Sequence, residues 1–493
     1  MQTTKNFLTA IVISISSIVN AVTIKSPKYE YAFSAMKQVA IKKVDLSKDN
    51  TIVTFKLNDG AGGIRIGRDI YIIEDGGIAH PATAINGADF DATITSELGT
   101  QREFTVTFAP CTNLRTQCLD IINGNDRIYG IHDADVSINV PQHEPKIDVT
   151  ETQRRSFTMD SVEIVGKIPG YKSTTPQNIY CQYRHVYKDI DKDKRHVALA
   201  ADGTFRMKLA ADHPELVLLI IYDRDKQVHE GLELASNIFV RPGSRLNLTI
   251  HSAVFDPANA WKGTEMHDDS GLTTYPELVN WYSTVSGTLY DLSVNNNITA
   301  AGRMKLSEAY QESIALAHYI IWHQHFSETA AYLYLSGLRM KYVDAMTMLT
   351  RDINERHPDT TPLDYSFIKE LAPNDLGYFC QTIHLCSLPP LDKIREQIEQ
   401  EYPQMAKPER ELMILRAQND ELNRITGWSG LTMMMQKMYV ENFWKAIGST
   451  SNNEEKKNIM RAILPQLTHL YLKNGIKEIT NNRGDINQST HDY

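Results

Sequence analysis

The sequence predicts a multidomain α+β protein in which two N-terminal β-sandwich or meander domains precede an all-helical bundle. Apolar residues alternate with polar ones over residues 24–145 and again over 156–252, but recur three or four positions apart over 262–478. The length of 493 residues suits about three domains. Apolar residues form 42% and charged residues 23% of the chain, as in ordinary folded globular proteins.

The first β region, 24–145, has the pattern of strands with one buried face. Phe55 and Leu57 alternate with polar neighbours, and Phe104 and Phe108 lie in a second run of the same kind. Glycine and Asn/Asp pairs recur between the runs as turn signals. Many short strands with regular turns favour a β-sandwich.

The second β region, 156–252, contains two clear turn signals. Asp202-Gly203 predicts a turn before an alternating run, and Pro242-Gly243 predicts a turn between two apolar runs. We therefore expect a meander or a small sandwich.

The helical region, 262–478, carries helix start and stop signals. Ser327 followed by Glu328 predicts a helix N-terminus, and Gly475 predicts a C-terminal stop. The remaining tail, 479–493, is polar, and we expect it to be frayed.

Residues 1–21 have the pattern of a signal peptide, with Lys5 before an uncharged apolar run and small residues up to Ala21. The alternative is a retained anchor, but the run of 13 residues is shorter than the roughly 20 that span a membrane. The first cysteine is Cys111, so no thiol is placed for lipid attachment. We expect a soluble exported protein of the periplasm or cell envelope, with no transmembrane span after cleavage, in a compartment that permits disulfides.

The charge balance disfavours nucleic acid as a partner. The chain has 51 basic and 60 acidic residues and a net charge of -9, whereas phosphate binding needs a basic surface. We expect an envelope protein or a ligand as partner, without a sequence signal for its identity.

Several motifs together resemble the N-terminal, non-catalytic half of exported bacterial thioredoxin-like (TlpA-like) proteins. In the first β region the matching residues are Phe104, Phe108, Pro110, Asp120, Gly130 and Ile131. In the second they are Gly166, Gly170, Tyr171, Asp202, Gly203, Phe205, Pro242 and Gly243. The resemblance covers about residues 1–270.

The chain departs from that family where its catalytic module would follow. Thiol exchange needs two closely spaced cysteines, but this chain has no C-x-x-C and no cysteine after Cys386. We therefore predict a non-catalytic protein of binding or assembly type. The alternative is a thiol-disulfide oxidoreductase family member, or an accessory, whose thioredoxin module is lost or separate.

Cys111 and Cys118 form the candidate structural disulfide of the first β region. A bridge over this short loop would stabilise the fold by roughly 2–3 kcal/mol. Two unpaired thiols, or a redox or metal site, are the alternatives. Cys181 is expected to be a buried thiol on a strand.

His318 and Trp322 lie one helical turn apart and are the candidates for lining a cleft, although the favoured interpretation of the cluster, His318 included, is partly buried or surface histidines. The neighbouring His323 and His325 point in different directions on a helix, so we expect them to be partly buried or surface histidines.

Other clusters favour structural interpretations. Cys380, His384 and Cys386 lack a fourth zinc ligand, and packing or a Cys380–Cys386 bridge is the simpler interpretation. The acidic run 189–193 lacks the glycine and glutamate of a calcium loop. The methionines of 433–438 suit a bundle core. No catalytic, cofactor-binding or metal-binding residue is predicted.

Overall fold

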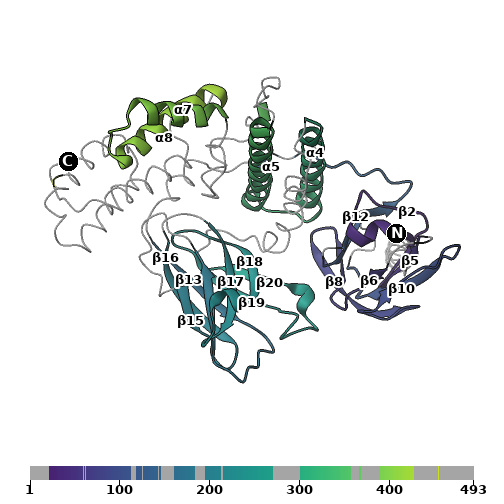
Figure 1. Cartoon of the computed structure of the whole chain (residues 1–493). Coiled ribbons are helices and arrows are strands. Elements are labelled where there is room, and N and C mark those ends of the chain that lie inside the picture. Colours follow the sequence, from purple (N-terminus) through teal and green to yellow (C-terminus); the bar gives the residue numbers. More distant parts are fainter. Residues whose placement is uncertain are drawn as a thin grey trace, which may run out of the picture. The chain divides into compact units, whose positions relative to one another are not determined.

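The computed structural model describes residues 21–58, 60, 63–112, 118–124, 126–142, 144–145, 160–183, 195–211, 215–269, 300–356, 366–367, 389–426 and 454. The chain divides into two compact units. Figure 1 shows its strands and helices, coloured along the sequence. The first unit contains Met1–His143, Asp256–Lys262 and His318–Phe326, and the second unit contains Glu144–Phe255, Gly263–Ala317 and Ser327–Tyr493. The predicted succession of a β-rich N-terminal part and helices on the C-terminal side is confirmed.

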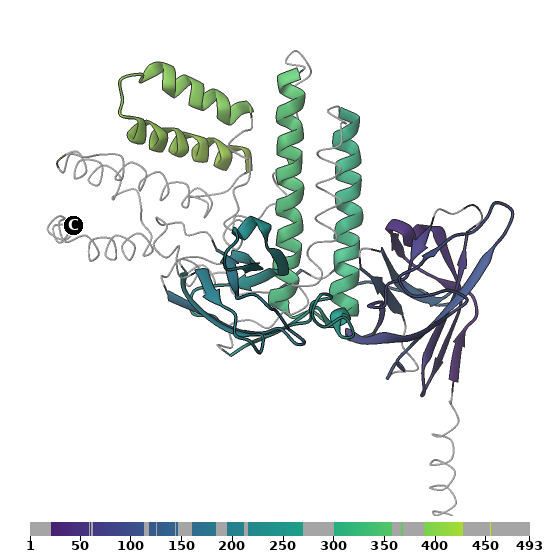
Figure 2. The same ribbon diagram turned by 60° about the horizontal axis from the view of Figure 1, so that its bottom comes forward.

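The first unit is built on one ten-stranded antiparallel sheet that is nearly closed (Figure 2). Its strands follow the order β1-β4-β5-β10-β8-β7-β11-β12-β2, and β3 also pairs with β12. The strand bounds are β1 Ala21–Ile24, β2 Pro27–Lys28, β3 Tyr31–Phe33, β4 Val39–Ser47, β5 Thr51–Leu57, β7 Tyr71–Glu74, β8 Ile78–Asn86, β10 Arg102–Phe108, β11 Leu119–Asn123 and β12 Asp126–Asp133. Two short strands, β6 Ile64–Arg65 and β9 Thr93–Ile94, pair separately, and η1 covers Ser34–Gln38.

The predicted alternation is confirmed in β5 and β10. Val53, Phe55 and Leu57 are buried on one face of β5. Phe104 lies directly opposite Phe55, and the two rings stack with centroids 5.1 Å apart. Such cross-strand pairs stabilise sheets, so these residues fix the register of β5 against β10.

The strands of this region do not form the two packed sheets of the predicted sandwich. Alternation shows which face of a strand is buried, but not which strands share a sheet. Register shifts interrupt three pairings, at Ile41/Lys43, at Thr107/Phe108 and at Leu119/Ile121. Such bulges bend strands and increase their twist, which lets one sheet curl around its own core.

The β part of the second unit consists of two four-stranded sheets, in the orders β16-β13-β19-β20 and β15-β14-β17-β18. The bounds are β13 Asp160–Lys167, β14 Gln177–Gln182, β15 His196–Ala198, β16 Thr204–Ala211, β17 Glu215–Asp223, β18 Leu232–Val240, β19 Arg245–Ile250 and β20 Thr264–Asp268; η3 is Val228–Glu230, and η4, Ala260–Lys262, belongs to the first unit. Apolar residues from both sheets share one buried core, as in a sandwich. Strand β20 lies beyond residue 252, where the sequence placed the end of this β region.

Two motifs of the second β region have clear physical roles. The predicted turns are present, because Gly203 and Gly243 adopt positive φ angles of 80° and 90°. Gly166 pairs with Phe205, and a Cβ on Gly166 would lie 2.1 Å from the Phe205 ring. The ring therefore covers the glycine, and a larger residue at 166 would displace it.

The described helices are α4 Ala300–His323, α5 Glu328–Arg356, α7 Pro389–Glu401 and α8 Lys407–Thr426. Ser327 begins α5 as predicted, since its Oγ accepts a hydrogen bond from the Ala330 N–H at 3.2 Å. Within the second unit, Tyr310 of α4 stacks on Tyr342 of α5 with ring centroids 4.0 Å apart, and the two helices run side by side (Figures 1 and 2). Among the residues that the structure describes, no helix combines the length and apolar character needed to cross a membrane.

Candidate functional site

The C-terminal end of α4 belongs to the first unit, where it lies against the sheet. The Phe326 N–H donates to the Ile321 carbonyl at 3.0 Å, and the His325 N–H donates to the Trp322 carbonyl at 3.4 Å. His325 has a positive φ of 53°. These bonds form a Schellman arrangement with a histidine at the left-handed position that glycine usually occupies.

The hairpin between β7 and β8 caps this helix end. Its turn is Asp75-Gly76-Gly77, and the Gly76 N–H donates to the His323 carbonyl at 2.9 Å. Both glycines have positive φ angles, 90° and 80°. A Cβ on Gly77 would lie 3.2 Å from the Gln324 carbonyl oxygen. Glycine is therefore required here by backbone conformation and by the close approach of the helix end.

A bulge in β12 lies opposite Asp120, the residue of the sheet that the end of α4 contacts. Leu119 pairs with Ile131 and Ile121 pairs with Ile128, so two residues of β12 lie opposite the single residue Asp120. One of the two is Gly130, with a positive φ of 70°. Its N–H donates to the Asp120 Oδ1 at 2.9 Å. The bulge thus supplies a backbone donor to a carboxylate in the middle of a sheet.

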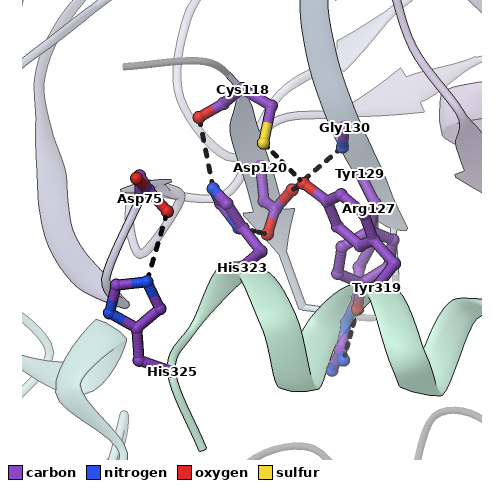
Figure 3. Close-up of polar contacts among 9 residues, drawn as sticks. All are labelled: Asp75, Cys118, Asp120, Arg127, Tyr129, Gly130, Tyr319, His323 and His325. Atoms are coloured by element: carbon purple, nitrogen blue, oxygen red, sulfur yellow. Dashed lines mark hydrogen bonds and ion pairs between the residues drawn. The ribbon is translucent and has the colours of Figure 1, made fainter. Parts of the chain in front are cut away.

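Asp120 receives three hydrogen bonds, two of them from α4 (Figure 3). The Tyr319 hydroxyl donates to Oδ1 at 2.7 Å, and His323 Nδ1 lies 2.8 Å from Oδ2. The second ring nitrogen, Nε2, lies 3.2 Å from the Cys118 carbonyl oxygen. Tyr319 and His323 are one helical turn apart, so one face of α4 contacts both oxygens of the same carboxylate.

Aromatic rings enclose this polar cluster. The Tyr319 ring lies 6.3 Å from Tyr31, 6.4 Å from Tyr129 and 5.3 Å from the His323 ring. The side chains of Asp120 and His323 are both 0% exposed. An ion pair in such surroundings interacts strongly, because little water screens it.

His323 is charged in this environment. Burial is the largest influence and lowers its pKa, but the charge of Asp120 and hydrogen bonds to Asp120 and Cys118 outweigh it and raise the pKa of His323 to about 11. Both ring nitrogens face oxygen acceptors, so both carry protons. Burial, followed by the charge of Asp120, raises the pKa of Tyr319 well above its ordinary value, so the hydroxyl remains a donor.

This chemistry suits attachment and not proton transfer. A general base needs a pKa near the working pH and a free nitrogen that can reach its substrate. His323 is protonated at neutral pH, and its nitrogens are engaged by Asp120 and Cys118. We call Asp120, Tyr319 and His323 the helix latch, because they hold the end of α4 on the sheet.

The structure describes Cys111 and Cys118 as buried thiols in different surroundings. Burial is the main cause that raises the pKa of Cys111 to about 11; a hydrogen bond with Thr51 lowers it, and the charge of Glu74 raises it. The sulfur of Cys118 lies 3.4 Å from the Tyr319 hydroxyl, beside the latch. The disulfide between the two cysteines stays a prediction. Cys181 is buried on β14, as predicted.

His318 and Trp322 both lie on the last turns of α4. His318 is buried, and the Trp322 ring is half-buried, 6.1 Å from Tyr319 and 6.3 Å from His323. Trp322 therefore packs beside the latch, and the predicted cleft at these two residues stays a prediction.

The sequence did not predict the latch residues. The helical pattern around His323 predicts a partly buried or surface histidine, but the residue is fully buried, and its partner on the sheet is 203 positions away. Asp120 is the residue from which the latch could have been predicted, because its carboxylate lies within the fully buried strand Leu119–Asn123. A buried charge needs a partner of opposite charge.

Several predicted features fall outside the described residues. They are the signal peptide up to residue 20, the acidic run 189–193, the cluster of Cys380, His384 and Cys386, the methionine run 433–438 and the tail 479–493.

Comparison with protein-family models finds no match to this chain. Comparison with curated proteins likewise finds no match. Neither comparison links the chain to the thioredoxin-like proteins that its motifs resemble.

Proposed function

We propose that this chain is an exported protein of the cell envelope that acts by binding or assembly and not by catalysis. The helix latch is the observation that carries this proposal. A histidine and an aspartate in contact are frequent catalytic partners, but here the ion pair is fully buried and its hydrogen bonds are internal. Its chemistry is used to fix a helix on a sheet, which suits a protein that presents a defined surface.

The alternative function, thiol-disulfide exchange with a lost or separate catalytic module, gains no support from the described cysteines. An exchanging cysteine needs an accessible thiolate with a lowered pKa. Cys111 and Cys118 are 3% and 1% exposed, and burial raises the pKa of Cys111. We propose that these side chains stabilise the first unit.

An insulin-reduction assay on the full chain with dithiothreitol tests the catalytic side of this proposal. We expect no acceleration over dithiothreitol alone, with a thioredoxin as positive control. In parallel, chemical cross-linking of the purified chain in envelope extract, followed by mass spectrometry, should give cross-links to one partner from the same set of surface lysines. Acceleration that disappears in Cys111→Ser or Cys118→Ser would establish thiol exchange and overturn the proposal.

A further inference from the structure

A second polar cluster lies on the face of the sheet opposite Asp120. Glu74 ends β7, His80 lies on β8, and Cys111 follows β10. One ligand atom from each, a carboxylate oxygen, a ring nitrogen and the sulfur, lies within 4.8 Å of the other two. The three residues come from separate segments, so no local sequence motif announces them.

The strand register places this cluster on the core side of the sheet. Ile72, a core residue, pairs directly with His80, and Glu74 is two residues further along the same face of β7. Glu74 is 0%, His80 6% and Cys111 3% exposed. Three polar groups in an apolar core are costly unless something satisfies them.

The hydrogen bonds within the structure leave His80 unsatisfied. Its Nε2 is buried and has no hydrogen-bond partner among the described residues. This atom points into the cluster, 3.4 Å from the Glu74 Oε1, without the geometry of a hydrogen bond. A buried nitrogen in that state destabilises the fold, so its surroundings suit a ligand that the nitrogen can bind.

We propose that Glu74, His80 and Cys111 bind a zinc ion. Thiolate, imidazole and carboxylate are the three side-chain donors that zinc takes, and sulfur with nitrogen disfavours calcium and magnesium. A tetrahedral zinc with its usual bond lengths separates ligand atoms by about 3.3–3.6 Å. The separation of His80 Nε2 from Glu74 Oε1 is 3.4 Å, so ion binding requires only a small approach of Cys111. A water molecule completes the coordination.

Neighbouring threonines already orient two of the three ligands. The Thr112 hydroxyl donates to the Glu74 Oε1, and the Cys111 N–H donates to the Thr51 hydroxyl at 3.2 Å. Partners of this kind fix the direction of metal ligands and raise affinity. The Cys111 sulfur itself lies within 4.8 Å of the other two ligand atoms.

Zinc binding and the predicted disulfide exclude each other. A bond from Cys111 to Cys118 would take away the sulfur ligand, since the thiolate is the form that binds metal. Peptide mapping of the alkylated, unreduced protein therefore separates the two states.

Metal content and cobalt spectroscopy of the full chain test the proposal. The chelator-treated protein is incubated with Zn²⁺ alone or Co²⁺ alone, dialysed, and analysed for bound metal and for the near-ultraviolet absorption of a cobalt–thiolate bond. The variants are Cys111→Ser, His80→Gln and Glu74→Gln. Matched controls are Cys181→Ser and His251→Gln, which replace a buried cysteine and a half-buried histidine of the second unit.

We expect about one metal ion per chain, a thiolate band that Cys111→Ser abolishes and the controls retain, and at least a tenfold loss of zinc affinity in His80→Gln and Glu74→Gln. The wild-type measurement decides the matter even where a variant does not fold: a chain that retains no zinc overturns the proposal. So does a Cys111–Cys118 disulfide in the purified protein, or a thiolate band that Cys111→Ser leaves unchanged.

Discussion

Replacing Asp120 separates the charge of the helix latch from its hydrogen bonds. Asp120→Ala removes the acceptor and leaves the Tyr319 hydroxyl, the Gly130 N–H and the His323 Nδ1–H without it. Asp120→Asn keeps one oxygen for Tyr319 and Gly130 and turns an amide N–H toward His323. Neutral His323 can accept that bond at Nδ1 and still donate from Nε2 to the Cys118 carbonyl.

The two variants should therefore differ in stability. Each of the three hydrogen bonds to the charged Asp120 contributes about 1.5–3 kcal/mol, and their sum is an upper bound on the stability lost in Asp120→Ala. Removing one partner of a buried ion pair usually costs about 3–5 kcal/mol. We expect a loss of about 3–5 kcal/mol in Asp120→Ala and a clearly smaller loss in Asp120→Asn. Since domains are stable by about 5–15 kcal/mol, urea unfolding resolves both.

The pH dependence of the free energy of unfolding tests directly whether His323 is charged. The folded pKa of His323 is about 11, above the ordinary value of 6.5, so the folded state binds the proton more tightly. This contribution to the free energy of unfolding is complete below about pH 6.5 and is lost as the pH rises through about 11. Between these values it falls by about 1.4 kcal/mol per pH unit. Asp120→Asn should lack this slope.

Urea unfolding of both proteins at several pH values from 7 to 10 measures the difference, and imidazole ¹⁵N spectra, assigned with His323→Gln, report the protonation of His323 directly. Asp75→Asn is the matched control, because Asp75 pairs with the exposed His325 at 3.6 Å and should change stability by less than about 1 kcal/mol. Parallel pH profiles for wild type and Asp120→Asn would mean that His323 is neutral in the folded protein, and the account of the latch would be wrong.

Three further outcomes are expected. Gly130→Ala should destabilise the protein by about 1–3 kcal/mol more than Gly124→Ala in urea unfolding, because both have positive φ but only a Cβ at Gly130 would meet Glu30, at 2.9 Å; equal losses would contradict this. Ser327→Ala should cost about 1 kcal/mol by removing the N-cap of α5, whereas Ser327→Asp should restore it. Mass spectrometry of the protein from its own cells should find Val22 as the first residue, and an intact Met1 would contradict the predicted signal peptide.

Local patterns in the sequence predicted what local forces decide. The alternation around Phe55 and Phe104, the turn at Asp202-Gly203 and the helix start at Ser327 all appear in the structure. Each depends on residues within a few positions, where backbone sterics and one buried face determine the outcome.

The pairing of distant segments could not be predicted in this way. The first β region forms one sheet because bulges change the direction of its strands, and the bulge at Gly130 has no signature beyond the glycine itself. The latch joins Asp120 of β11, which lies opposite the bulge of β12, to a helix end 203 positions later. The helical neighbours of His323 give no information about a partner on a distant strand.

The geometry of the latch explains why the buried pair of Asp120 and His323 is charged, although two apolar side chains would cost less free energy to bury. Replacing a buried ion pair by apolar residues is often neutral or stabilising, so stability alone does not account for it. The position that the contacts give α4 on the sheet explains why the ion pair is present. Tyr319 and His323 contact the two oxygens of Asp120, and a shift of α4 by one turn would bring Ala315 opposite one oxygen and leave a buried charge without its partner. An apolar contact would tolerate that shift, because packing against a flat apolar surface depends little on register. The ion pair therefore selects one position of the helix end on the sheet, at the modest stability expected of a buried pair.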